Sequence, residues 1–223
     1  MGIIDLVAAF TGPSEKTLRR FGYWDESARF EKIYLHPGDH AGYYPGSSPI
    51  SLKLIFDKKD GRIISAQAVG KDGVEKRIDV ISMAIQQNAT VYDLEEAELC
   101  YAPQFGSAKD PVNLAGMIAA NVLRGDSQIA HWEALDSDPV FMLDVRDPDE
   151  FKKGYVDGAV NIPLNDLRQR MGEVPKDQEV WSYCLVGQRS YYAARALSQY
   201  GYNIKSLSGG YSTFKARKLL TEL

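Results

Sequence analysis

Hydrophobic and polar residues alternate along part of the first half of the chain. Segment 50–56 has an apolar side chain at every second position, which is typical of a strand with one buried face. Lys59-Asp60-Gly61 indicates a tight turn, and residues 62–69 are expected to return as the partner strand of a hairpin. A further strand is expected over 32–35. These segments predict an antiparallel sheet.

Three segments of the first half have apolar residues at helical spacing. The first follows Ser14, a residue type that caps helix N-termini, and runs through Arg20. The second covers 77–87, and the third covers 112–123, where Asp110-Pro111 precedes the first turn. The first half is therefore expected to be an α+β domain in which helices accompany the antiparallel sheet.

Strand and helix patterns alternate in the second half. Strands are expected over 140–145, 159–163, 179–184 and 203–207. Helices are expected over 148–153, 164–171, 189–200 and after Gly209-Gly210. This alternation predicts an α/β domain, a small parallel sheet flanked by helices. The pattern changes at Arg124-Gly125-Asp126-Ser127, which predicts two domains, residues 1–126 and 127–223.

Composition narrows the classes of function. The chain has 223 residues, is 44% hydrophobic and carries a formal net charge of −4. No apolar run approaches the roughly 20 residues that span a bilayer, and we identify no signal peptide, so no membrane association is expected. No basic stripe is present, so nucleic acid is not an expected partner. Two cysteines make no disulfide framework, which predicts the reducing cytoplasm.

The segment from Tyr183 to Tyr191 carries the clearest chemistry. Cys184 ends a predicted parallel strand, and a loop containing Gly187 leads into a predicted helix. Ligands bind at the carboxyl ends of such strands, and a helix N-terminus presents unpaired N–H groups. A loop folded around the sulfur would point several amides at it, and Arg189 adds a positive charge. These features favour a thiolate, so we expect Cys184 to be a nucleophile.

Other candidate residues have structural interpretations. Cys184 itself could be a packed strand cysteine, although the Cys-x4-Arg-Ser spacing favours the nucleophile. Arg146 and Glu150 could be acid–base residues, but an i,i+4 ion pair between them is favoured. Cys100 lacks the strand–loop–helix context and is expected to be packed and inert. His36 and His40 lack a third ligand at metal spacing, so no metal is expected.

Residues from about 128 to 216 resemble single-domain rhodaneses, which are sulfurtransferases. The matching segments are 143–151, 158–164, 184–190 and 207–211. The resemblance implies that Cys184 accepts a sulfane sulfur, becomes a persulfide and passes the sulfur to a second thiophile, with Arg189 as part of the site. It also implies a substrate-binding loop made by Leu185, Val186, Gly187, Gln188 and Ser190.

Loop length separates rhodaneses from related phosphatases, which have one more residue between the cysteine and the arginine. Four residues intervene here, which favours sulfur transfer over a phosphatase or an arsenate reductase. The sulfur donor would be a persulfide, a polysulfide or thiosulfate. Tyr155 stands where the family often has histidine, at a position that we interpret as structural.

Residues from about 3 to 124 resemble the dimerisation domain of pyridine nucleotide-disulfide oxidoreductases, in particular the coenzyme A-disulfide reductase branch. The matching segments are 11–16, 36–37 with 40–46, and 101–105 with 107–113. The resemblance implies a homodimer formed through this domain. Some members carry a C-terminal rhodanese and reduce coenzyme A persulfides or polysulfides. Tyr43 and Tyr101 match tyrosines that reach the active site of the other subunit in that family.

The chain lacks the Gly-x-Gly-x-x-Gly pattern of dinucleotide-binding domains. We therefore expect no cofactor in this chain, with FAD and NADH supplied only by a separate flavoprotein partner. The leading hypothesis is a homodimeric cytoplasmic sulfurtransferase acting through a Cys184 persulfide. The alternative is an accessory subunit that docks on, or delivers sulfur to, such a flavoprotein. A phosphatase is the third hypothesis.

Overall fold

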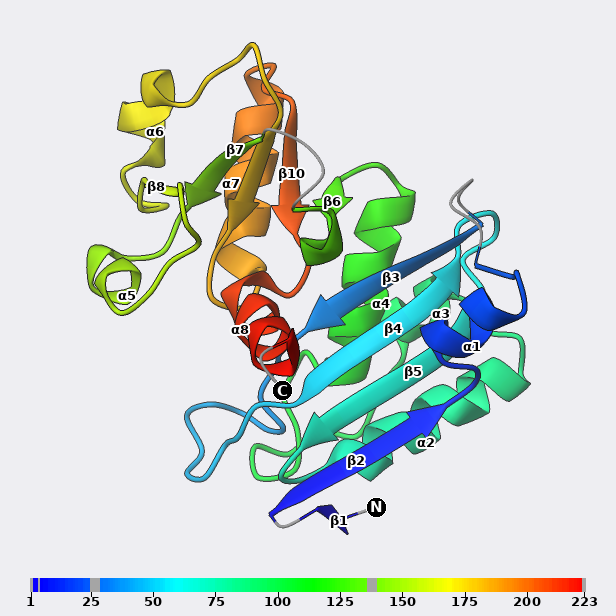
Figure 1. Ribbon diagram of the computed structural model, residues 1–223. Coiled ribbons are helices and arrows are strands. Elements are labelled where there is room, and N and C mark those ends of the chain that lie inside the picture. The colour runs from blue at the N-terminus through cyan, green and yellow to red at the C-terminus, as the bar shows by residue number, and fades with distance from the viewer. Residues whose placement is uncertain (1, 4, 25–28, 136–139, 222–223) are drawn as a thin grey trace. The chain divides into compact units, whose positions relative to one another are not determined.

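The computed structural model describes residues 2–3, 5–24, 29–135 and 140–221 (Figure 1). The chain divides into two compact units, Met1–Leu123 and Arg124–Leu223. Within the described ranges, no helix is long and apolar enough to cross a membrane. The domain boundary that we place between residues 126 and 127 stays a prediction.

The first unit is built on an antiparallel sheet, as predicted. Its strand order is β1-β2-β5-β4-β3, and the β4–β5 hairpin carries a bulge at Ile55/Phe56. The strands are β1 (Gly2–Ile3), β2 (Leu6–Thr11), β3 (Phe30–Leu35), β4 (Ser51–Asp57) and β5 (Ile63–Gly70). We did not predict β1 or β2 from the sequence, because residues 6–10 form a continuous apolar run without the alternation that marks a strand.

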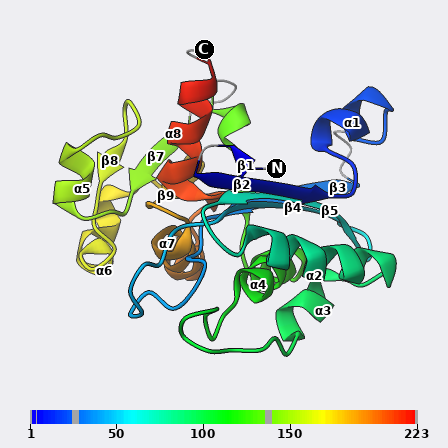
Figure 2. The ribbon, with the colours of Figure 1, turned by 90° about the horizontal axis from the view of Figure 1, so that it is seen from below.

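Helices cover one face of this sheet, where α2, α3 and α4 lie together (Figure 2). The helices of the unit are α1 (Glu15–Arg20), α2 (Val74–Gln86), α3 (Val91–Glu96) and α4 (Pro111–Leu123). The predicted cap is confirmed, since the Ser14 side chain accepts a hydrogen bond from the Thr17 amide. We did not predict α3, which is only six residues long and begins with a capping box of Thr90 and Asp93.

The second unit is built on a parallel sheet of order β6-β10-β9-β7-β8, which confirms the predicted α/β class. The strands are β6 (Ile129–Ala130), β7 (Phe141–Asp144), β8 (Val160–Asn161), β9 (Val180–Tyr183) and β10 (Ile204–Leu207). The helices are α5 (Pro148–Lys152), α6 (Leu167–Arg170), α7 (Gln188–Gln199) and α8 (Gly210–Thr221). Short 3-10 turns lie at 132–134 and 171–173.

Both faces of the parallel sheet are buried. Leu143 and Val180 belong to a core cluster that includes Leu197 of α7. Trp181 and Tyr183 belong to a second cluster, against which Phe214 of α8 packs. Because neighbouring residues of a strand point to opposite faces, α7 and α8 cover opposite sides of β9, the middle strand. The residue after β9 is Cys184.

Candidate active site

Cys184 lies at the carboxyl end of β9, between the strand and α7, as the sequence predicts. The residue is buried, with 1% of its surface exposed. Its Sγ accepts a hydrogen bond from the Gly187 N–H at 3.2 Å. Gly187 has φ of +105° and precedes the first residue of α7. This positive φ, which glycine adopts without strain, turns the chain so that the amide faces the sulfur.

Two carbonyls of the cysteine loop, residues 184–190, accept hydrogen bonds from the start of α8. The amides of Tyr211 and Ser212 donate to Cys184 O at 2.8 Å and to Leu185 O at 2.9 Å. A Cβ on Gly210 would lie 2.5 Å from Cys184 O, so the close contact requires glycine here. Two carbonyl oxygens are thereby directed to α8, which leaves the inner side of the loop to N–H groups.

Arg189 is paired with two carboxylates. Its guanidinium bonds both Glu150 oxygens at 2.6 and 2.8 Å and Asp147 at 3.2 Å. The hydrogen bond to Glu150 is the main cause that raises the pKa of Arg189, with smaller contributions from the charges of Glu150, Cys184 and Asp147. The same hydrogen bond lowers the pKa of Glu150. Arg189 is therefore a fixed cation with charged partners.

The predicted ion pair between Arg146 and Glu150 is wrong. Arg146 instead turns inward and bonds Asp144 with Nη2–Oδ2 at 2.5 Å, and its Nη2 also donates to Gly154 O at 2.8 Å. Asp144 is fully buried at the end of β7. A buried carboxylate without a partner costs several kcal/mol, so it takes the nearest arginine. Glu150 is left for Arg189.

The other predicted loop residues lie in different environments. Leu185 and Val186 are exposed, and the Gln188 amide donates to the Tyr192 hydroxyl at 3.3 Å. Ser190 is buried beneath the loop, where its hydroxyl donates to Gly187 O at 3.0 Å. Ser190 thus supports the turn, and its hydroxyl is directed at the backbone. A substrate-binding role for Leu185, Val186, Gly187, Gln188 and Ser190 remains a prediction.

Tyr43 and Tyr101 meet in the first unit, with their hydroxyls 2.6 Å apart. Both rings are exposed, and the hydrogen bond with Tyr43 raises the pKa of Tyr101. Their loops are joined by the Ala41 amide, which bonds Gly106 O at 2.9 Å. The sequence shows the two tyrosines separately, and only the fold brings them together. Their predicted role toward a partner subunit remains untested.

Arg77 of α2 anchors the same two loops from below. It is 2% exposed and donates to Asp110 Oδ2 at 2.8 Å and to Asp39 O at 2.6 Å. This buried ion pair was not predicted from the sequence. Arg77 begins the predicted amphipathic helix 77–87, and arginine is a residue type that is mostly exposed. Nothing in the neighbouring sequence therefore indicates that its side chain is buried.

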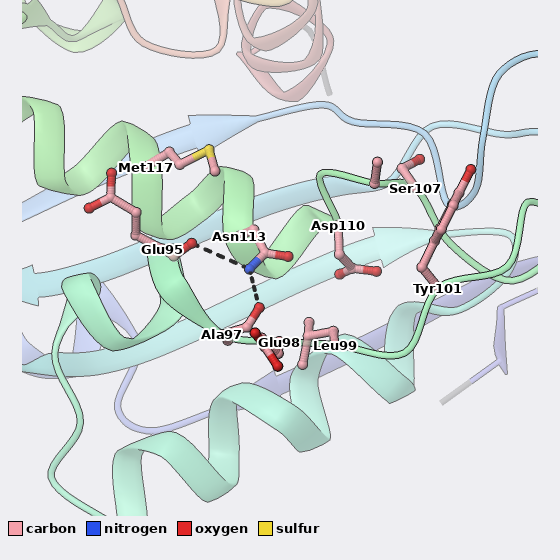
Figure 3. Close-up of a pocket in the computed structure, with 10 residues that line it drawn as sticks. Glu95, Ala97, Glu98, Leu99, Tyr101, Ser107, Asp110, Asn113 and Met117 are labelled. Carbon is pink, nitrogen blue, oxygen red and sulfur yellow. Dashed lines mark hydrogen bonds between the residues drawn. The ribbon is translucent and has the colours of Figure 1, made fainter.

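A hollow of about 460 Å³ lies beside Tyr101, between the α3–α4 layer and the 97–108 segment (Figure 3). Asn113 of α4 closes one wall by donating to Ala97 O at 2.8 Å. Asp110 lines the hollow but is bonded to Arg77. The sequence analysis did not predict this hollow, because its walls come from segments that share no motif.

The remaining predictions concern cysteine and histidine. Cys100 is exposed, so the expectation that it is packed is wrong. The segment after α3 runs along the surface without regular structure, so no core reaches that side chain. His36 bonds the Ser51 hydroxyl at 2.9 Å, and His40 lies 3.0 Å from Asp39. No group of three or more His, Cys, Asp or Glu residues suited to a metal occurs in the described part of the chain.

Comparison with protein families identifies the class of each unit. Residues 2–111 match the pyridine nucleotide-disulphide oxidoreductase dimerisation domain, and residues 127–217 match the rhodanese-like domain. The chain carries these two domains in this order, and both resemblances drawn from the sequence are confirmed. The matches include no FAD- or NAD-binding domain.

The pair of domains is similar to the C-terminal part of longer proteins. The CoADR-RHD of Bacillus anthracis is 43% identical with a TM-score of 0.89, over 94% of this chain and 37% of that one. A NAD-dependent persulfide reductase from A. fulgidus is 34% identical with a TM-score of 0.84, over 95% of this chain and 38% of that one. The coenzyme A disulfide reductase of Staphylococcus epidermidis is 45% identical over 112 residues, 50% of this chain and 24% of the relative.

Proposed function

We propose that this protein is a sulfurtransferase that carries sulfur on Cys184. The thiolate attacks a sulfane sulfur, the S–S bond of the donor breaks, and its electron pair leaves with the rest of the donor. The Cys184 persulfide then gives its outer sulfur to a second thiophile. The observation that carries the proposal is the Gly187 N–H bonded to Sγ at 3.2 Å, in a loop whose Cys184 and Leu185 carbonyls accept hydrogen bonds from α8.

Loop geometry supports sulfur transfer over phosphate chemistry. Amides directed at the sulfur would stabilise a thiolate and a persulfide anion without reorganisation. Four residues separate Cys184 from Arg189, which makes a narrow loop, and Cys184 itself is 1% exposed. A single sulfur atom fits beside this buried thiol in a narrow loop better than the larger tetrahedral phosphate of a phosphoester does. The proposal assigns no step to a flavin in this chain.

The test is thiosulfate:cyanide sulfurtransfer combined with mass spectrometry. We expect turnover in the wild type, none in Cys184→Ser, and wild-type turnover in Cys100→Ser. After incubation with polysulfide, the Cys184 peptide should gain about 32 Da, one sulfur atom. Because Cys100 is exposed, polysulfide can reach its thiol without turnover, and Cys100→Ser controls for this. Equal activity of the two variants would exclude Cys184 as the carrier.

A second candidate function is assembly. The first unit matches a dimerisation domain and presents the exposed Tyr43–Tyr101 pair. We infer that the protein forms a homodimer through this unit. The same unit would let it dock on, or deliver sulfur to, a separate FAD- and NADH-binding reductase. We also propose that the protein is cytoplasmic. The sulfur donor of the proposed sulfurtransferase would be a persulfide, a polysulfide or thiosulfate.

A further inference from the structure

Arg189 is the one charged residue of the cysteine loop, and its charge is more than neutralised. Its Nη1 and Nη2 donate to the two carboxylate oxygens of Glu150 at 2.6 and 2.8 Å, and Nη1 also donates to Asp147 Oδ2 at 3.2 Å. One positive and two negative charges leave this trio with a net charge of −1. The sequence alone predicts the opposite, an uncompensated cation beside the sulfur.

Both carboxylates are held in place by α5 and do not depend on Arg189. Asp147 is the N-cap of α5, and Glu150 is its third residue. They form a capping box in which the Asp147 amide donates to Glu150 Oε2 at 3.1 Å. The side chain of Glu150 is 28% exposed, whereas that of Asp147 is 64% exposed. Water therefore screens the Asp147 charge more than that of Glu150.

Arg146, the second arginine of this corner, does not restore a positive charge. It is buried and bonded to Asp144 through both carboxylate oxygens. That pair is neutral as a unit. Attraction for an incoming anion then rests on the backbone amides of the loop, which carry partial charges and act only at hydrogen-bond range.

We propose that Glu150 and Asp147 are specificity-determining residues, which make the Cys184 loop select sulfur donors with one negative charge or none over the dianion thiosulfate. This inference rests on the proposed function and specifies its substrate class. The donors it favours are persulfides and organic thiosulfonates, and Glu150 contributes more than Asp147 because it is less exposed.

The two donor types react at the same kind of sulfur but carry different charges and release different leaving groups. With thiosulfate, the Cys184 thiolate attacks the sulfane sulfur, the S–S bond breaks and sulfite leaves, so three negative charges are present throughout. Methanethiosulfonate reacts at the same kind of sulfur and releases methanesulfinate, with two negative charges. A neutral persulfide RSSH leaves RS⁻ and a protonated Cys184 persulfide. The difference in reactivity of the two donors cancels between variants. The change between variants in the ratio of kcat/KM for methanethiosulfonate to that for thiosulfate therefore measures the charge selectivity.

The experiment measures this ratio in the wild type, Glu150→Gln and Asp147→Asn, with cyanide as the common acceptor. We expect the ratio to fall about fivefold in Glu150→Gln and about twofold in Asp147→Asn, the order expected when one unit charge leaves a partly exposed site. Both substitutions keep an oxygen acceptor for the capping box. Added salt should lower the ratio in the wild type more than in Glu150→Gln.

Asp149→Asn is the matched control. It makes the same charge change on the same helix, but its side chain is 87% exposed and bonds Lys152. An unchanged ratio in Glu150→Gln and Asp147→Asn, or an equal change in Asp149→Asn, would overturn the inference. A folding defect lowers both rates together and leaves the ratio unmoved. If the wild type transfers sulfur from neither donor, the proposed function itself fails.

Discussion

Two carboxylates of the second unit, those of Asp144 and Glu150, each bond an arginine. The fully buried Asp144 has Arg146, and the half-buried Glu150 has Arg189. The first pair lies in the interior and is 2 residues apart, whereas the second joins residues 39 apart. If Arg146 paired with Glu150 instead, the buried Asp144 would be left without this cation. The inward turn of Arg146 therefore decides which arginine remains at the cysteine loop.

Arg146→Met tests this division at the residue scale. We expect the second unit to lose about 3–5 kcal/mol of stability, because Asp144 would remain buried without a partner. Urea unfolding followed by fluorescence, with Trp132 and Trp181 in the core of this unit, measures the loss. Arg170→Met is the control, since Arg170 pairs with Glu173 on the surface and should change little. Similar losses for the two variants would show that the buried pair is unimportant.

Two elements that follow different strands build the cysteine loop. The start of α7 supplies the turn through Gly187, and the start of α8 binds the loop carbonyls. Gly210 makes this second contact possible, and Trp132 Nε1 donates to its carbonyl at 3.1 Å. The shape of the loop is thus a property of two helix N-termini, since the carbonyls of Cys184 and Leu185 accept hydrogen bonds from α8.

Gly210→Ala is the corresponding prediction at the scale of elements. The new Cβ would lie 2.5 Å from Cys184 O, so α8 or the loop must move, and we expect sulfurtransfer kcat/KM to fall more than tenfold. Gly201→Ala is the control, because Gly201 also has a positive φ, but among the described residues nothing lies within 4 Å of its Cβ position. Both variants carry a backbone cost of about 1–2 kcal/mol.

Because both variants carry this backbone cost, a loss of stability alone does not identify the contact between α8 and the loop, and activity must. If Gly201→Ala loses as much sulfurtransfer as Gly210→Ala, general strain explains the loss and the contact between α8 and the loop does not.

The whole molecule combines two units with separate cores and separate family relationships. The first carries the Arg77–Asp110 pair under the tyrosine loops, and the second carries the cysteine loop. Dimerisation belongs to the first unit in our proposal. Mass action then stabilises this unit as the protein concentration rises, whereas a monomeric second unit gains nothing directly.

Calorimetry of the full chain tests this assignment. We expect two transitions, of which one rises in temperature with protein concentration. Arg77→Met should lower that transition by removing a buried cation from Asp110, and Arg146→Met should lower the other. Light scattering should report a dimer in the wild type. Two concentration-independent transitions together with a monomeric mass would contradict the homodimer.

Much of the fold could be predicted because its signals are local. Alternation over 50–56 predicted β4, and helical spacing over 112–123 predicted α4 almost to the residue. The signals failed for short or uniformly apolar segments such as α3 and β2. The site was predicted as a cysteine in a strand-to-helix loop, yet the partners of Arg146 and Glu150 were assigned wrongly. An i,i+4 rule describes neighbours on one helix, and Arg146 precedes α5.

The sequence by itself determined the two domain classes and the position of Cys184 between a strand and a helix, because periodicity and turn residues act over a few neighbouring positions. Only the tertiary structure decided that Arg189 faces two carboxylates, that Gly210 lies against Cys184 O, and that Tyr43 reaches Tyr101. Each of these contacts joins distant parts of the chain. Charge balance and close packing depend on residues that only folding brings into contact, and no pattern of neighbouring residues predicts these contacts.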